Sequence, residues 1–294
     1  MSNCTPEQMS FPPVNGFTVR GEFNGGALSS DFGPMILRGV DQQIGLIKQL
    51  SAAVRDQRHP SYIEHSLEDL VRQRIFQVAC GYEDANDATA LRQDPLFKLG
   101  LERTPLDADQ DLASGPTFSR LENAVTARDL YRMAQVFVDQ FIACYAEPPE
   151  LIVLDMDHSE DPTHGQQELA LFNHYYGHQC YMPLFLFEGL SGRFITATLR
   201  PGKRPKGAEN AMILRRVVRR LRRHWPETHI VLRGDSHFAN VELMQMAADD
   251  KHLDFIFGLP SNAVLKRQAQ PLMEGARALH ATRCHNAKRM GQPL

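Results

Sequence analysis

Features that would mark a secreted, membrane-spanning or disulfide-bonded protein are missing from this sequence. Its five cysteines, at positions 4, 80, 144, 180 and 284, include no Cys-x-x-Cys pair, which argues against a disulfide framework or a four-cysteine zinc site. No apolar run is long enough to span a membrane, and the proline-containing start has neither the basic nor the apolar segment of a signal peptide. We therefore predict a cytoplasmic protein without a membrane partner.

A large net charge is also missing, although the charges that are present are unevenly distributed. The formal net charge is −3 at pH 7. Residues 1–146 carry 13 basic and 19 acidic side chains, whereas residues 193–223 carry 11 basic side chains and one acid, Glu209. This concentration of positive charge predicts a polyanionic partner.

The residue pattern divides the chain into three regions. Residues 1–38 are rich in Gly, Pro, Ser and Asn, which predicts an extended arm with little regular structure. Residues 39–147 show apolar stripes at helical spacing, and the helix-start signals Ser66-x-x-Asp69 and Thr126-x-x-Asp129 precede two of them. We predict a helical domain here, with shorter helices near residues 84–92 and 116–122.

Residues 148–294 change to a pattern of strands and helices. The predicted strands are residues 151–157, 180–187, 193–199, 229–235 and 253–258, and the predicted helices follow the third and fourth strands. The order β-β-β-α-β-α-β indicates a mixed sheet covered by helices. The fold class is therefore α/β (α+β), with a helical domain before the sheet.

Two of these predicted strands end in carboxylates. Asp155 and Asp157 lie at alternate positions of the first strand, so they share one face of it. Asp235 ends the fourth strand. If the two strands are neighbours, the carboxylates meet at one edge of the sheet, where they suit a hard divalent cation such as Mg²⁺.

Short sequence segments around these acids resemble those of a known protein family. They are Leu-Asp-Met-Asp-His-Ser-Glu-Asp-Pro-Thr-His-Gly-Gln-Gln (154–167), Phe-Asn-His-Tyr-Tyr-Gly (172–177), Tyr-Met-Pro-Leu (181–184), Leu-Arg-Pro-Gly (199–202) and Leu-Arg-Gly-Asp-Ser-His-Phe (232–238). In combination, and over residues 15–294, they resemble the DDE transposases of bacterial insertion sequences. The order of strands likewise resembles the ribonuclease H-like core.

The resemblance implies a site, its metals and its partners. Asp157 matches the first family carboxylate and Asp235 the second, while Asp155 is a supporting or alternative ligand. These acids would hold two Mg²⁺ or Mn²⁺ ions that cut and join DNA strands at element ends. The expected partner is double-stranded DNA, at terminal repeats and target, with the helical domain binding DNA ends and a homodimer as an open alternative.

The third family carboxylate has no clear counterpart. Glu242, Asp249, Asp250, Asp254 and Glu274 follow Asp235, but none stands in the family's helix with Tyr, Arg and Lys at fixed spacing. We therefore expect a core truncated before that carboxylate and a chain that is catalytically incomplete. A DNA-end-binding competitor of the active enzyme is the alternative function.

Other interpretations of the same residues remain open. The aspartates could serve a haloacid-dehalogenase-type phosphotransferase, or merely cap strand ends. His174, His178 and Cys180 could bind zinc. The basic residues could form a solvated surface, although the shortage of acids among them favours contact with DNA phosphates; they are Lys203, Arg204, Lys206, Arg215, Arg216, Arg219, Arg220, Arg222 and Arg223.

Overall fold

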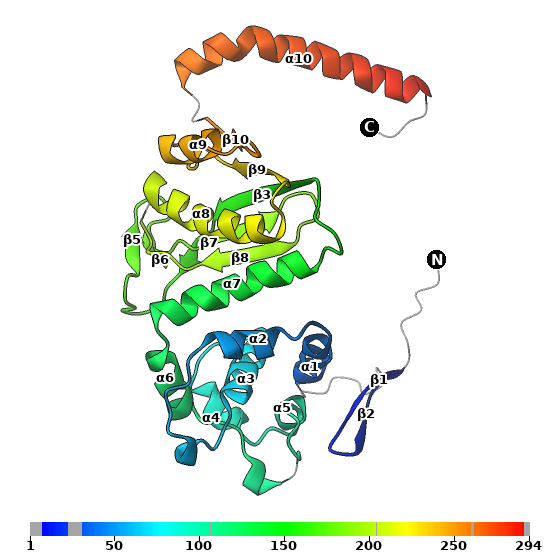
Figure 1. The fold of residues 1–294 in the computed structure, drawn as a ribbon, viewed down its shortest axis with the longest axis vertical. Helices are drawn as coiled ribbons and strands as arrows, with labels where there is room; N and C mark the ends of the chain where they lie inside the picture. Colours follow the sequence, from blue (N-terminus) through cyan, green and yellow to red (C-terminus); the bar gives the residue numbers. More distant parts are fainter. Residues whose placement is uncertain (1–7, 23–30, 106, 204, 260–261, 291–294) are drawn as a thin grey trace.

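The computed structural model describes residues 8–22, 31–105, 107–203, 205–259 and 262–290. Figure 1 shows a hairpin and a group of short helices at one end, a sheet with helices in the middle, and a long helix at the other end. The long helix, α10 (Ala263–Met290), contains Pro271, and its described side chains are exposed except that of Leu265, which is half-buried.

Six helices form the first unit, and one of them, α3, begins where a capping signal predicts. The helices are α1 (Gly33–Ile44), α2 (Leu46–Ala53), α3 (Leu67–Ala79), α4 (Asp87–Leu91), α5 (Pro95–Gly100) and α6 (Gly115–Ala124), with 3₁₀ turns at Pro60–Tyr62 and Ala108–Gln110. The Ser66 side chain accepts a hydrogen bond from the Asp69 N–H at the start of α3. The predicted short helices near residues 84–92 and 116–122 are confirmed as α4 and α6.

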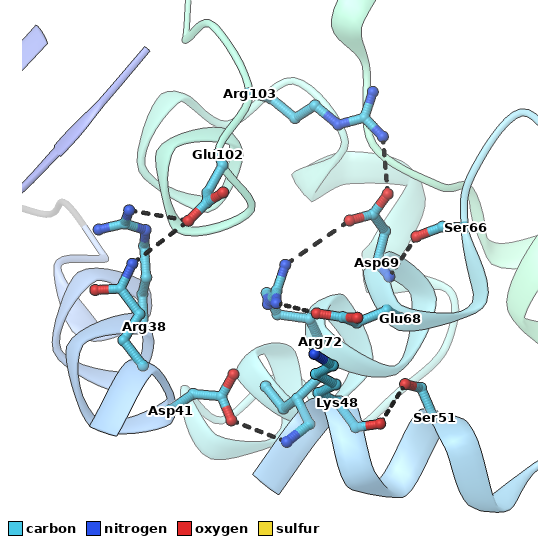
Figure 2. A network of polar contacts seen from close by, with 12 residues as sticks. Arg38, Asp41, Lys48, Ser51, Ser66, Glu68, Asp69, Arg72, Glu102 and Arg103 are labelled. Carbon is cyan, nitrogen blue, oxygen red and sulfur yellow. Dashed lines mark hydrogen bonds and ion pairs between the residues drawn. The ribbon is translucent and has the colours of Figure 1, made fainter. Parts of the chain in front are cut away.

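Charged side chains fix the loop after α5 to two other helices of this unit (Figure 2). Arg103 donates to the Asp69 carboxylate at 3.1 Å, and Arg38 on α1 donates to Glu102 at 2.9 Å. Below this network lies a shared apolar core, whose buried members include Ile47, Leu50, Val71, Phe76 and Phe97. The helices therefore pack as one unit around that core.

Helix α7 (Ala127–Ala143) joins the helical unit to the sheet. A capping box of Thr126 and Asp129 starts it, as predicted. Its Phe137 packs against the core of the helical unit, whereas Val138 and Phe141 are buried in the core of the sheet. The helix that the sequence assigns to the first domain therefore belongs equally to the second.

The main sheet has five strands in the spatial order β10-β9-β3-β7-β8. Central β3 (Leu151–His158) is antiparallel to β7 (Leu184–Glu188), which is antiparallel to β8 (Phe194–Thr198). On the other side β3 is parallel to β9 (His229–Gly234), and β9 is parallel to β10 (Leu253–Phe257). The predicted β-β-β-α-β-α-β order is confirmed, and with it the mixed sheet of the ribonuclease H-like fold.

Helices α7, α8 (Gly207–His224) and α9 (Val241–Ala248) contribute to the core of this sheet. The apolar stripe of α8 includes Leu214, Val217 and Leu221, which are buried with Leu154 and Leu232 of the strands. Because side chains alternate along a strand, the residues between these buried positions project from the opposite face. That second face carries Asp155 and Asp157.

The structure corrects the expected arm at residues 1–38. Gln8–Val14 (β1) and Phe17–Glu22 (β2) form an antiparallel hairpin, and α1 begins at Gly33. Asn15 and Gly16 both have positive φ, 46° and 82°, as expected for the tight turn that an Asn-Gly pair favours between strands. The prediction of little regular structure is therefore wrong for the described part; residues 1–7 and 23–30 lie outside it.

The predicted strand at residues 180–187 is also wrong, because it is two strands in different sheets. Its beginning belongs to β6 (His178–Tyr181), which pairs with β4 (Asp161–Pro162) and β5 (Leu171–Asn173) in a small three-stranded sheet. Its end is β7 of the main sheet. Pro183 lies between them and has no N–H to donate to a ladder, so the continuous apolar pattern hides a break.

Candidate active site

Two aspartates stand where neighbouring parallel strands end. In the ladder between β3 and β9, Met156 lies opposite Gly234, and the next residues along the chain are Asp157 and Asp235. Neighbouring strands lie about 4.8 Å apart, so the two carboxylates share one edge of the sheet. The prediction that these acids end adjacent strands is confirmed.

Asp157 and Asp235 line two pockets that meet at the pair. One pocket, of about 610 Å³, lies over the second face of the sheet and is also lined by Asp155, Phe185, Phe187 and Arg233. The other, of about 950 Å³, extends toward the small sheet and is also lined by Glu160, Lys203 and His237. Both carboxylates are therefore accessible to a large polar ligand.

Asp157 and Asp235 interact unfavourably while both are charged. Partial burial raises the pKa of the Asp157 carboxyl, and the negative charge of Asp235 raises it further. The Asp235 carboxylate accepts a hydrogen bond from the backbone N–H of His237 at 2.8 Å. A cation shared by the two carboxylates would relieve their repulsion.

Asp155 has a different environment from Asp157, although both lie on the same face of β3. Arg233 of β9 donates two hydrogen bonds to the Asp155 carboxylate, from Nε at 2.9 Å and from Nη2 at 2.5 Å. These bonds lower the pKa of Asp155. The predicted supporting ligand is thus already occupied by an arginine, which leaves Asp157 and Asp235 as the open pair.

A buried polar group lies behind the pair. His158 stacks on Phe238 with ring centroids 4.8 Å apart. Burial, together with the positive charge of Arg200, lowers the pKa of His158 to about 4, so the ring is neutral at pH 7. Arg200 is itself buried and pairs with Glu209 of α8 at 2.6 Å.

The basic residues of α8 fall into two groups. Arg220 donates two hydrogen bonds to Asp139 of α7, at 2.7 and 2.6 Å. Arg222 donates to backbone carbonyls that include His252 at 2.9 Å, and to Asp250 at 3.3 Å. Both predicted DNA-binding arginines therefore hold the fold together. The remaining predicted arginines of the helix are exposed: Arg215, Arg216, Arg219 and Arg223.

The predicted basic residues before α8 lie closer to the aspartates. Lys203 is exposed and lines the larger pocket together with Asp157 and Asp235. Lys206 is exposed at the start of α8. Arg204 lies outside the described residues. Of the predicted basic set, Lys203 is thus the residue that shares a pocket with the acid pair.

Comparison with known proteins identifies the family. The model of the family described as "Transposase DDE domain group 1" matches residues 11–290, which is most of the chain. The chain belongs to this DDE transposase family. A search among curated proteins found no match. Transposases of the family generally use divalent metal ions.

Two solved transposase structures are distantly similar. One is a piggyBac transposase synaptic complex with hairpin DNA, with 16% identity and a TM-score of 0.35, over 79% of this chain and 52% of that one. The other is the Mos1 strand transfer complex, with 12% identity and a TM-score of 0.25, over 80% of this chain and 79% of that one. The DDE chain described here spans about half the length of the piggyBac chain.

The later acids of this DDE transposase chain do not join the pair. Asp250 is held by Arg222, Asp254 contacts His229 at 2.8 Å, and Glu274 lies exposed on α10. Among the described residues, there is no group of three or more His, Cys, Asp or Glu side chains arranged to hold a metal ion. The same finding leaves the zinc hypothesis for residues 174–180 without support in the described part of the chain.

The sheet also separates this chain from the phosphotransferase alternative. In a haloacid-dehalogenase-type enzyme the first strand leads to a helix in a Rossmann-like sheet, whereas here β3 pairs antiparallel with β7.

The described helices include none with the length and hydropathy of a membrane-spanning segment.

Several residues near the pair were not predicted. Glu160 lines the larger pocket and contacts His178, and the backbone N–H of His237 donates to Asp235. An aromatic turn, residues 172–176, lines the same pocket; of these residues the sequence singled out His174 alone, as a candidate zinc ligand. All of these lie inside the sequence segments that carry the family resemblance, but side chains at a turn have no periodicity from which their direction could be read.

Proposed function

We propose that this chain carries an incomplete site for cutting and joining DNA strands at the ends of an insertion sequence, in which Asp157 and Asp235 hold a divalent cation and the lack of a third carboxylate among the described residues slows the reaction. The observation that carries the proposal is the position of these two acids at the ends of adjacent parallel strands, in pockets that they share. Carboxylates that merely cap strand ends would not need to line shared pockets.

The acid pair fits a hard cation. Two carboxylates supply oxygen ligands of the kind that Mg²⁺ or Mn²⁺ prefers, while water and phosphate oxygens fill the remaining positions. The second ion expected for a complete site would need carboxylates beyond this pair. When bound, the cations would activate the attacking hydroxyl and stabilise the leaving oxygen at phosphorus.

The residues around Asp157 and Asp235 would favour the binding of a cation and a phosphate by these two acids. Arg233 neutralises Asp155, so that three negative charges do not accumulate on one short stretch of sheet edge. Lys203 lines the larger pocket together with Asp157 and Asp235, and its ammonium group would attract a phosphate there as a point charge. His158 is neutral at pH 7 and therefore does not compete with a cation for the carboxylates.

Double-stranded DNA is the proposed substrate, and α8 offers a second contact surface for it. Its four exposed arginines lie on a helix that covers the face of the sheet opposite to Asp155 and Asp157. They would therefore contact phosphates at a distance from the strand that is cut. Such contacts add affinity without sequence preference.

Nicking of supercoiled plasmid DNA carrying the element ends tests the catalytic proposal. We expect nicking that requires Mg²⁺ or Mn²⁺ and that is lost in Asp157→Asn and in Asp235→Asn. Asp254→Asn is the matched control, because that carboxylate is exposed on β10 and paired with His229. Nicking that survives in both site variants would refute the assignment, and hydrolysis of a small phosphoester without nicking would favour the phosphotransferase.

DNA affinity tests the role of α8. Arg219→Ala should weaken duplex binding and reduce the slope of log K against log salt by about 0.9, the value for one phosphate contact. The measurement is fluorescence anisotropy between low and moderate salt. An unchanged slope in Arg219→Ala and Arg223→Ala would mean that this helix face is only solvated.

A further inference from the structure

An uncovered aromatic cluster lies beside the acid pair. The aromatic turn consists of Phe172 of β5 and of His174, Tyr175 and Tyr176 between β5 and β6, and Tyr175 is 87% exposed. The rings contact one another: Tyr175 and Tyr176 have centroids 4.9 Å apart, and Phe172 and His174 5.1 Å apart. Exposed apolar groups that gather in this way usually mark a binding surface.

The turn has a fixed shape. The Asn173 side chain donates to the Gly202 carbonyl at 2.9 Å and accepts from the Tyr175 N–H at 3.0 Å. The Gly177 N–H donates to the Asn173 carbonyl at 2.8 Å, and Gly177 has a φ of +81°. Because the backbone is held at both ends, the rings are presented without the entropy cost of ordering a loose loop.

The loop carrying Gly202 packs closely under the turn. A Cβ atom at Gly202 would lie 2.1 Å from the Cys180 carbonyl oxygen and 2.6 Å from that of Leu171. Only glycine therefore allows the Lys203 loop and the small sheet to approach to this distance. This contact places the Lys203 ammonium and the aromatic rings on one pocket wall.

The aromatic turn and the acid pair share the pocket of about 950 Å³. Asp157 and Asp235 line one part of it, and Phe172, Tyr175 and Tyr176 line another. The pocket thus combines the two carboxylates of the proposed cation site, an ammonium group and uncovered ring faces. A nucleotide has the matching parts, since it joins a phosphate to a flat aromatic base.

We propose that the aromatic turn, with Tyr175 as its most exposed ring, is a stacking platform for an unpaired base of the DNA strand whose phosphate lies at Asp157 and Asp235. This inference rests on the proposed function. The base must be unpaired because both faces of a base inside a duplex are covered by its neighbours. Stacking on aromatic rings tolerates any base, so the platform would recognise a frayed or cut end rather than a sequence.

The test compares two DNA probes that differ by unpaired bases. One is a blunt fluorescein-labelled duplex, and the other is the same duplex with a three-nucleotide single-stranded end. Anisotropy in Ca²⁺, which offers the acid pair a hard divalent cation, gives the ratio of their dissociation constants, and gel electrophoresis of the same samples checks that no strand is cut. We expect the wild-type protein to prefer the single-stranded end, and Tyr175→Ala to lose about 5- to 100-fold of that preference.

Two variants serve as controls. Tyr175→Trp keeps a ring at the position and should keep the preference. Tyr62 is a matched control because it is 85% exposed, contacts the His59 ring at a tilt with centroids 5.6 Å apart, and lines a separate pocket of about 450 Å³ in the helical unit. Tyr62→Ala should bind both probes as the wild type does.

Three results would overturn the inference. They are equal affinity of the wild type for both probes, an unchanged preference in Tyr175→Ala, and an equal loss in Tyr62→Ala. A change of oligomeric state in Tyr175→Ala without a change in DNA preference would instead make the turn a contact between copies. The binding assay needs no cleavage, so it separates the two proposals. Plasmid nicking by a protein that shows no preference for the single-stranded end refutes the stacking platform alone. A preference that depends on the Tyr175 ring, in a protein that does not nick plasmid DNA, refutes the catalytic proposal alone.

Discussion

Asp155 and Asp157 are two residues apart on one face of one strand, yet neutralising them should have opposite effects on stability. Asp157→Asn removes a partly buried charge that is repelled by Asp235, so we expect the folded protein to gain stability at pH 7.5. Asp155→Asn removes a carboxylate that accepts two hydrogen bonds from Arg233, so we expect a loss. Each variant is the control for the other.

The expected sizes follow from the exposure of the groups. Two unit charges about 5 Å apart, the spacing of neighbouring strands, interact by about 1 to 2 kcal/mol at effective dielectric constants of about 40 to 80. The Arg233 and Asp155 side chains are 42% and 39% exposed, which limits their pairing to about 0.2 to 1 kcal/mol. For a chain of this size, 1 kcal/mol corresponds to about 2 °C in Tm.

The pH dependence of the free energy of unfolding provides a second, independent test of the two assignments. The pKa of Asp157 is raised in the folded protein, so folding favours the protonated carboxyl. This contribution to the free energy of unfolding is fully present below the ordinary pKa of 3.8 and is lost as pH rises through the folded pKa. The gain from Asp157→Asn should therefore shrink as pH falls toward 4. The pKa of Asp155 is lowered, so its contribution persists above 3.8 and is lost only as pH falls through the folded value.

Differential scanning calorimetry of the three proteins from pH 4.5 to 7.5 measures these effects. In addition, Mg²⁺ should raise the Tm of the wild type more than that of Asp157→Asn, because a bound ion stabilises the folded state. Equal signs of the two Tm shifts at pH 7.5, or an equal response to Mg²⁺, would refute the assignment of Asp157 as the open carboxylate.

Two further predictions concern the fold around the site. Thr126→Ala should lower the free energy of unfolding by about 1 kcal/mol in urea titrations, because it removes the cap of α7; Thr126→Ser should retain it, and equal losses in both would argue against the cap. Gly202→Ala should destabilise the protein by about 1 to 3 kcal/mol through overpacking and abolish the preference for single-stranded ends, because its Cβ would displace the Cys180 backbone. A folded Gly202→Ala variant with wild-type Tm and preference would contradict the close approach.

Features that depend on neighbours in sequence could be predicted from the sequence. The caps of α3 and α7 are formed by residues three positions apart, so Ser66 and Thr126 identify helix starts without knowledge of the fold. The alternation along β3 places Asp155 and Asp157 on one face in any sheet. The order of strands and helices then limits the possible topologies, and it places the ends of β3 and β9, with Asp157 and Asp235, at one edge.

Features that depend on partners from distant segments were decided by the tertiary structure. The alternation along β3 treats Asp155 and Asp157 alike, and the register of β9 gives them different environments by placing Arg233 beside Asp155. The arginine run of α8 likewise gave no sign that Arg220 would meet Asp139 of another helix. The aromatic turn became part of the acid pocket because the Gly202 loop holds the small sheet against the large one. Pairing, burial and direction of these side chains arise from contacts between segments far apart in the chain, and local patterns do not record such contacts.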